Sequence, residues 1–301
     1  MSGLQLSKLN DIKIEPVIDQ TKRDPSKIVG YQYFNEPYSN VCLVARKQSG
    51  KTTTIYRALE KCATKGMNIM IFASSVNNDA TFKKMKKMLK EKKCNVKTYT
   101  HFITDSGVNL IEEFLKIQSD GDGKTGKKEE SADEIPKSFI NFGQYDHLIA
   151  GYAGQDTTIP VVKKKKKKKP EENPNKKIAP ETIIVIDDMS TACRHPSISR
   201  LLTKNRHYRL KIFLSCHSVV NLDPMGLRMI DVFMLFPNLS EERIIEVADK
   251  VGISFKTDTK KHKKLYDLYC DATRERFNFL YVDRTNCTYR RNFSEIYEIT
   301  E

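Results

Sequence analysis

The stretch that decides the fold runs from Ala45 to Thr52 and reads ARKQSGKT. It follows an apolar run, Val41 to Val44, and precedes a segment whose apolar residues recur at helical spacing. A loop between a buried strand and a helix can direct backbone N–H groups at phosphate oxygens, because the first N–H groups of a helix have no partner within it. The stretch therefore predicts a phosphate-binding loop (P-loop) in an α/β fold.

The individual loop positions have expected roles in holding Mg-ATP. Lys51 is expected to place its ammonium on the β- and γ-phosphates, and Thr52 its hydroxyl on Mg²⁺. The pattern G-x-x-x-x-G-K-[ST] has glycine where this chain has Ala45, so Ala45 must keep a negative φ. The residues predicted to bind the nucleotide are Ala45, Gln48, Ser49, Gly50, Lys51, Thr52 and Thr53.

A second motif, the apolar run Ile183 to Ile186 followed by two carboxylates, resembles a Walker B element. Ligands of open α/β sheets bind at the carboxyl ends of the strands, where these acids would lie. We expect Asp187 to hold the Mg²⁺ shell through water, and Asp188 to orient or deprotonate the attacking water. His217, after another apolar run, is the candidate for sensing the γ-phosphate, with a surface or capping role as the alternative.

Short apolar runs alternate with helical patterns along the chain, which predicts a mainly parallel sheet with helices on both faces. Nearly all-apolar runs are typical of strands that are covered on both sides. Ser240 is expected to begin a helix and Gly252 to end it. The expected strands are residues 41–44, 68–73, 182–186, 211–215, 232–236 and 277–282. In the C-terminal segment we also expect a helix around Leu265 to Tyr269 and a strand at Tyr289.

The length of 301 residues, 39% of them apolar, suits one large α/β domain. We expect a single domain over residues 1–301, completed by an extension at 255–301 and interrupted by a disordered, lysine-rich insertion at 119–180. Within the insertion, residues 139–150 are apolar enough to dock on the core. No apolar run approaches the roughly 20 residues that span a bilayer, so we expect an intracellular protein with no membrane partner. The cysteines are scattered without a C-x-x-C pair and are expected to be reduced thiols.

The formal net charge of +14 points to a polyanionic partner, because Lys and Arg release condensed counterions when they neutralise phosphates. Residues 119–180 contribute only +3 of this charge, from 13 Lys against 10 Asp and Glu, so +11 belongs to the rest of the chain. Two basic features of different kinds are candidate DNA contacts. A helix expected from Asp79 to Lys93 would expose a one-sided lysine face, either as a solvated surface or as a polyanion site. The run Lys163 to Lys169 is a DNA-binding arm, a nuclear localisation signal or plain low complexity.

The order of these elements resembles the DNA-packaging ATPases of large double-stranded DNA viruses, virophages and related transposons, a poxvirus-type family of the FtsK-HerA superfamily. The resemblance covers residues 35–118 and 180–240. It rests on the P-loop, on the acidic pair followed by Met189, and on Arg206-His207 ahead of the next strand. It implies a RecA-like (ASCE) P-loop NTPase that forms a ring and uses ATP to translocate double-stranded DNA into a capsid. Capsid proteins would then be partners, in the host cytoplasm or nucleus or in the virion.

The resemblance also implies that an arginine of one subunit completes the site of its neighbour and stabilises charge on the transferring phosphoryl group. Arg206 is the first candidate and Arg228 the second, with a surface ion pair or a backbone cap as the alternative for each. Two positions depart from the family, which usually has glycine at Asn205 and commonly glutamine at His217.

Three other classes of protein would contain some of these motifs. A P-loop kinase acting on a nucleotide or small metabolite would use Lys51 and Thr52 in the same way, but it does not need a water-activating carboxylate at Asp188. A RecA-like helicase would have to act as a ring, because the chain is too short for a second RecA-like unit. A non-enzymatic DNA-binding protein with a degenerate P-loop would account for Ala45, but not for the acidic pair.

Overall fold

The computed structural model describes residues 24–123, 177–189, 192–252 and 261–298. The segment 139–150 and the run Lys163 to Lys169 lie outside the described residues. Among the described residues, no helix combines the length and apolarity needed to cross a membrane.

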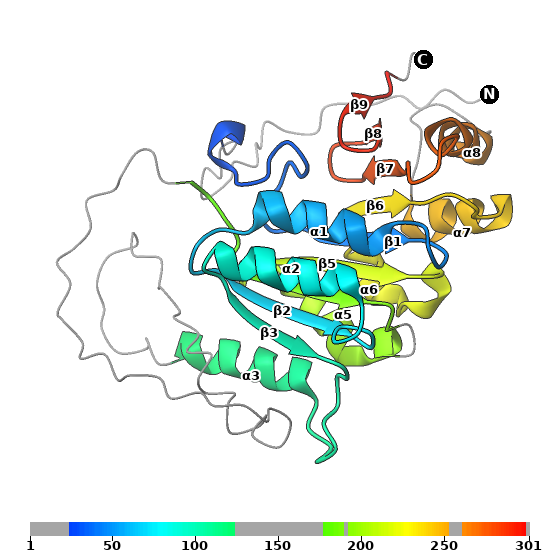
Figure 1. Ribbon diagram of the computed structural model, residues 1–301. Helices are drawn as coiled ribbons and strands as arrows, with labels where there is room; N and C mark the ends of the chain where they lie inside the picture. Colours follow the sequence, from blue (N-terminus) through cyan, green and yellow to red (C-terminus); the bar gives the residue numbers. More distant parts are fainter. Residues whose placement is uncertain (1–23, 124–176, 190–191, 253–260, 299–301) are drawn as a thin grey trace, which may run out of the picture.

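The described strands form one nine-stranded sheet in the order β3-β2-β4-β5-β1-β6-β7-β8-β9 (Figure 1). From β3 to β6 the strands are parallel, and from β6 to β9 each pair is antiparallel. One strand, β5, separates the P-loop strand β1 from the acidic strand β4, and the fold is α/β of the RecA-like type. The strands are β1 (Asn40–Val44), β2 (Asn68–Ala73), β3 (Asn95–Tyr99), β4 (Thr182–Asp187), β5 (Leu210–Cys216), β6 (Val232–Leu235), β7 (Leu280–Asp283), β8 (Thr288–Arg291) and β9 (Glu295–Ile296).

Helices cover both faces of this sheet and bury β1, β4, β5 and β6 at every position. On one face, α1 (Lys51–Cys62) and α2 (Ala80–Glu91) lie side by side and share an apolar cluster with the strands (Figure 1). A second cluster holds the other helices against the opposite face. These are α3 (Leu110–Gly123), α5 (Pro196–Thr203), α6 (Pro224–Arg228), α7 (Glu241–Val251) and α8 (Lys261–Ala272).

The strands and helix ends predicted from the sequence are confirmed. A strand occurs in each of the six expected ranges, β8 contains the strand expected at Tyr289, and α8 contains the helix expected at Leu265 to Tyr269. Strands β3 and β9 are additional to the predicted ones. Asp79 caps α2 by accepting from the N–H groups of Thr81 and Phe82. Ser240 precedes α7, and Gly252, at φ 64°, ends it.

The described parts of the predicted insertion are tied to the domain at both ends. Helix α3 continues through residues 119–123, which the sequence analysis assigned to the insertion. At the other end, the Ile178 N–H donates to the Lys27 carbonyl at 2.7 Å, and the Ile178 carbonyl accepts from Val29 at 2.9 Å. Strands β7 to β9, from the predicted extension at 255–301, continue the sheet beyond β6. All the cysteines are free thiols, as expected.

Candidate functional site

The loop between β1 and α1 adopts a conformation suited to an anion. Ala45 keeps a negative φ, which removes the objection to alanine at this position, and its N–H donates to the Cys216 carbonyl at 3.0 Å. The chain takes a left-handed conformation at Gln48 (φ 59°) and at Gly50 (φ 95°). Gly50 precedes the first residue of α1, so the unpaired N–H groups of the helix start face the loop.

The other predicted loop residues occupy different environments. The Ser49 hydroxyl donates to the Arg46 carbonyl at 2.8 Å and so closes the loop on itself. Thr53 is exposed in the first turn of α1. The loop therefore presents backbone groups and Lys51 to a ligand, and the side chains of Arg46, Lys47 and Gln48 are exposed beside them.

Lys51 is the group of this loop that most needs a ligand. It is only 7% exposed, and its ammonium has no hydrogen-bond partner among the described residues. Nζ lies 3.8 Å from Asp188 Oδ1, which is an ion pair but too long for a hydrogen bond. Because a buried ammonium without hydrogen bonds is costly, this arrangement favours an anionic ligand that supplies acceptors.

A hydroxyl from β5 joins the two acidic residues at the end of β4. Ser215 Oγ donates to Asp187 Oδ1 and accepts from the Asp188 N–H at 3.0 Å. The other oxygen of Asp187, Oδ2, accepts from Thr52 Oγ1 at 2.8 Å. Ser215 is fully buried and was not among the predicted site residues. A hydroxyl two positions before His217, at the carboxyl end of an apolar strand, is the sequence signal that could have identified it.

The Thr52 and Asp187 pair could hold Mg²⁺. Both residues offer oxygen ligands, which this hard ion prefers, and Mg²⁺ usually takes its remaining ligands from water and from substrate phosphates. Within the part of the chain that the structure describes, no three His, Cys, Asp or Glu residues gather as a metal site. The residues thus fit an ion bound with a nucleotide better than an ion held by protein alone.

Asp188 has an unusual backbone that turns its carboxylate into the site. Its φ of 54° is left-handed, which is uncommon for a residue other than glycine and is often found at functional sites. Oδ1 lies 2.8 Å from His217 Nε2, and His217 Nδ1 lies 2.8 Å from the Ala45 carbonyl oxygen, to which it can only donate. His217 therefore links the start of the P-loop to Asp188.

These side chains come from three neighbouring strands. Lys51 and Thr52 follow β1, the two acids end β4, and Ser215 and His217 lie at the end of β5, between them. All of them lie at the carboxyl edge of the parallel sheet, where open α/β folds bind ligands. The arrangement can bind a phosphate chain, hold a divalent cation and present a carboxylate to a water molecule.

The structure places Arg206 away from this group. Its guanidinium donates to Asp231 Oδ1 at 3.0 Å, and the other oxygen of Asp231 accepts from the Asn40 N–H at 2.8 Å. Asn40 begins β1, so Arg206 lies at the amino edge of the sheet, opposite the P-loop of its own chain. Its side chain is 63% exposed. A role in a neighbouring subunit's site stays a prediction.

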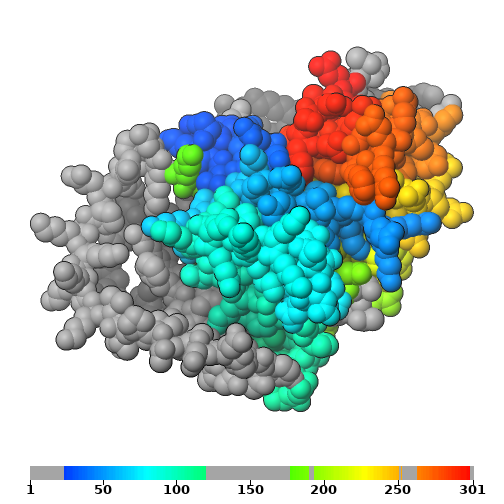
Figure 2. All heavy atoms as spheres, in the orientation of Figure 1, coloured from blue at the N-terminus to red at the C-terminus, as the bar shows by residue number. Residues whose placement is uncertain are grey.

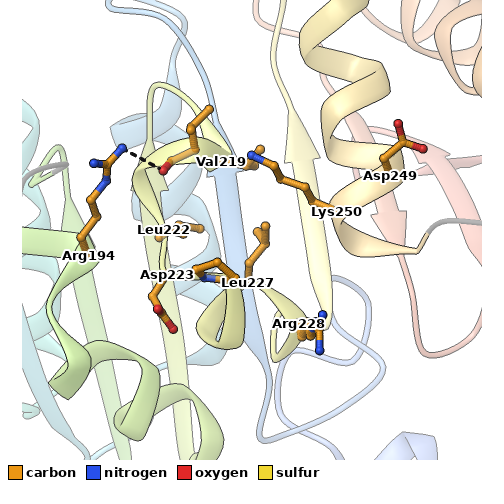
Figure 3. A pocket seen from close by; sticks show the side chains of 10 residues that line it. Arg194, Val219, Leu222, Asp223, Leu227, Arg228, Asp249 and Lys250 are labelled. Atoms are coloured by element: carbon orange, nitrogen blue, oxygen red, sulfur yellow. Dashed lines mark hydrogen bonds between the residues drawn. The ribbon is translucent and has the colours of Figure 1, made fainter.

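Arg228 is also outside the P-loop group. It is an exposed residue at the end of α6, beside a hollow of about 580 Å³ (Figure 3). Arg194 and Lys250 approach this hollow from opposite sides (Figure 3).

No protein-family model matches the sequence, and no curated protein matches it. The chain is similar to the genome packaging NTPase B204 from Sulfolobus turreted icosahedral virus 2 in complex with ATP-gammaS, with 17% identity, a TM-score of 0.44 and coverage of 85% of this chain and 98% of that one. It is also similar to EssC (ATPases 2 and 3) from Geobacillus thermodenitrificans, with 8% identity, a TM-score of 0.46 and coverage of 86% and 39%. The similar structures are thus those of a viral genome packaging NTPase and of EssC ATPase domains, at 17% and 8% identity.

Proposed function

We propose that this protein binds Mg-ATP at the P-loop, hydrolyses it, and uses the energy to translocate double-stranded DNA and so package a viral genome. One observation carries the ATPase part of the proposal. The buried Lys51 ammonium, without a hydrogen-bond partner among the described residues, lies beside the Thr52–Asp187 pair and within 3.8 Å of Asp188. A cation, a magnesium site and a carboxylate base are the parts that phosphoryl transfer to water requires.

Each residue would have a separate task in hydrolysis. Lys51 and the loop N–H groups would bind the β- and γ-phosphates, and Thr52 with Asp187 would hold Mg²⁺, which neutralises charge on the phosphate oxygens. Asp188 would accept a hydrogen bond from the attacking water and orient it. His217, which contacts Asp188 and the start of the P-loop, would change its contacts when a γ-phosphate arrives.

The DNA part of the proposal rests on charge. The apolar side of α2 faces the sheet, so the exposed lysines on its other side face solvent. Helix α2 lies beside α1 on this face of the molecule (Figure 2). A surface so rich in one sign of charge repels itself, and a polyanion relieves that repulsion. We define the lysine face as Lys83, Lys84, Lys87, Lys90 and Lys93, all of them exposed.

Ring assembly and further partners belong to the same proposal. A neighbouring copy would supply Arg206 or Arg228 to the P-loop site, and capsid proteins would receive the DNA in the host cytoplasm or nucleus. The resemblance to packaging ATPases supports this part.

Steady-state ATP hydrolysis, with and without linear double-stranded DNA, tests the proposal. We expect DNA to raise turnover several-fold and Lys51→Ala or Asp188→Asn to abolish it. The double variant Lys83→Gln/Lys87→Gln should keep basal turnover and lose the DNA response. The matched control Lys116→Gln/Lys177→Gln removes the same charge from exposed lysines outside the lysine face and should keep the response. Hydrolysis that is indifferent to DNA would set translocation aside and favour a small-molecule kinase.

A further inference from the structure

A second, smaller hollow of about 230 Å³ opens directly beside the P-loop. Residues 46–49 of the loop form one wall. Two other segments complete it, Pro237–Asn238 after β6 and Arg276–Phe277 before β7. None of the chemistry described above uses these two segments.

Phe277 is an exposed aromatic residue held in a strained conformation. The residue is 52% exposed, and its φ of 72° is a genuine outlier for a bulky residue. The chain after it is fixed, because the Phe279 N–H donates to Asn292 Oδ1 at 3.1 Å and Asn292 Nδ2 donates to Asn278 Oδ1 at 2.9 Å. The Arg276 guanidinium lies 4.7 Å from the centre of the Phe277 ring. Strain of this kind persists where the surroundings impose it, and it clusters at ligand sites.

The ring is in contact range of the phosphate-binding loop. A Cβ atom added to Gly50 would lie 3.1 Å from Phe277 Cδ1, so the ring packs against the last loop residue before α1. Asn238, which also lines the hollow, likewise has a left-handed backbone, at φ 68°. Its amide offers both donors and an acceptor to a polar edge.

The sheet order gives the direction in which a nucleotide would lie. The acidic pair and His217 fix the γ-phosphate end on the β5 and β4 side of β1. The hollow lies on the opposite side of β1, where β6 and β7 follow in the sheet. A phosphate chain that crosses the P-loop from the acidic pair would leave its nucleoside there, with Arg46 and Lys47 beside the inner phosphates.

We propose that Phe277 and Asn238 form the base-binding subsite of the protein, with the ring stacked on a purine and the Asn238 amide facing its polar edge. The inference rests on the proposed nucleotide binding at the P-loop. The loss of stacking between a base and an aromatic side chain typically weakens binding by roughly 5- to 150-fold. A purine offers the larger stacking face.

Calorimetric titration of the protein with Mg-ATP, Mg-UTP and inorganic tripolyphosphate tests this subsite. Wild-type protein should bind ATP more tightly than UTP, and Phe277→Ala should raise the Kd for ATP about tenfold while leaving the Kd for tripolyphosphate unchanged. Phe277→Gly, which accepts φ 72°, gives the same readout without backbone strain, and Phe277→Tyr should keep tight binding.

The outcomes separate the subsite from the proposed function. Lys51→Ala should weaken ATP and tripolyphosphate alike, since it acts on the phosphates. Wild-type protein that binds neither ATP nor tripolyphosphate would overturn the proposed function itself. Protein that binds both, with equal affinity for ATP and UTP or with no change in ATP affinity on loss of the Phe277 ring, would overturn the base-binding subsite alone.

Discussion

The two edges of the parallel sheet each hold a buried lysine, and the two lysines differ in whether their own chain supplies hydrogen-bond acceptors. At the amino edge, Lys211 of β5 donates to the Glu36 carbonyl at 2.9 Å and to Ser39 Oγ at 2.7 Å, and lies 4.5 Å from the centre of the Phe34 ring. At the carboxyl edge, the ammonium of Lys51 has no hydrogen-bond partner in the described parts of the chain.

The difference indicates that the Lys211 ammonium has a role in the fold, whereas the Lys51 ammonium is available to bind a ligand. A buried ammonium with two hydrogen bonds and an aromatic face has its partners within its own chain, although burial still disfavours its charged form. One without hydrogen bonds is stable only because the rest of the domain compensates for it. We therefore infer that the carboxyl edge needs an anionic ligand to supply hydrogen-bond acceptors for Lys51.

The largest effect is expected for Lys51→Met. ATP turnover should fall by roughly 10²- to 10³-fold, the range for removing a preorganised charge-stabilising group. The nucleotide-free protein should unfold at an unchanged or higher temperature, because the variant removes a buried cation that lacks hydrogen bonds. Steady-state kinetics and thermal unfolding without nucleotide measure the two quantities.

Lys61→Met, on the exposed side of the same helix, is the control and should change neither turnover nor unfolding temperature. A Lys51→Met protein that is markedly less stable than wild type would show that Lys51 supports the fold, and the contrast between the edges would be lost.

The buried charge of Lys211 should make the free energy of unfolding depend on pH. Burial lowers the pKa of Lys211 from 10.5 to about 8. Between these values the unfolded chain binds more protons than the folded one, so stability should rise as the pH increases from 8 to 10.5, by up to about 3 kcal/mol. Below pH 8 the cost of the buried charge is fully present.

Lys211→Met should remove this rise. Denaturant unfolding of both proteins at pH 7.5, 9 and 10.5 measures it, and the difference between them cancels the other groups that titrate in the window. Parallel curves for wild type and variant would contradict the assignment of a depressed pKa to Lys211.

The sequence predicted the central sheet because its strands are continuous apolar runs, buried on both faces. It did not predict β3, whose residues Asn95–Tyr99 mix polar and apolar side chains, because this strand lies at the edge of the sheet and is partly exposed. Edge strands are defined by the neighbour with which they pair, and pairing is a tertiary property.

In the candidate site, too, some features follow from local sequence patterns and others from the pairing of strands. The P-loop and the acidic pair are local patterns and could be predicted, whereas the role of Ser215 depends on the register of β4 and β5. That register pairs Ile186 with Leu214 and so brings the next residues, Asp187 and Ser215, side by side. The left-handed backbone of Asp188 and its contact with His217 are likewise set by packing between strands.

Ser215→Ala tests this register-dependent part of the carboxyl edge, with a smaller effect than Lys51→Met. Without the hydroxyl that joins Asp187 to Asp188, we expect turnover to fall about tenfold and the Mg²⁺ concentration for half-maximal turnover to rise, as for other residues that orient metal ligands. Ser199→Ala is the matched control, because Ser199 is also buried and also donates to a carboxylate, that of Asp223. Equal losses in the two variants would assign Ser215 a general structural role.

Arg206 should contribute little to stability, and a role for it in a neighbouring subunit would contradict the contrast between the two edges of the sheet. Its pair with Asp231 is largely exposed, so Arg206→Ala should change the free energy of unfolding by less than about 1 kcal/mol.

If Arg206 serves a neighbour's P-loop, turnover should fall with little loss of stability, and mixing Arg206→Ala with Lys51→Met protein should restore activity. The restored sites would combine an intact Lys51 from one chain with an intact Arg206 from the next. A mixture no more active than its parts, with full turnover by Arg206→Ala alone, would leave Arg206 as a surface ion pair. Recovery would instead make the amino edge of one chain part of the next chain's site.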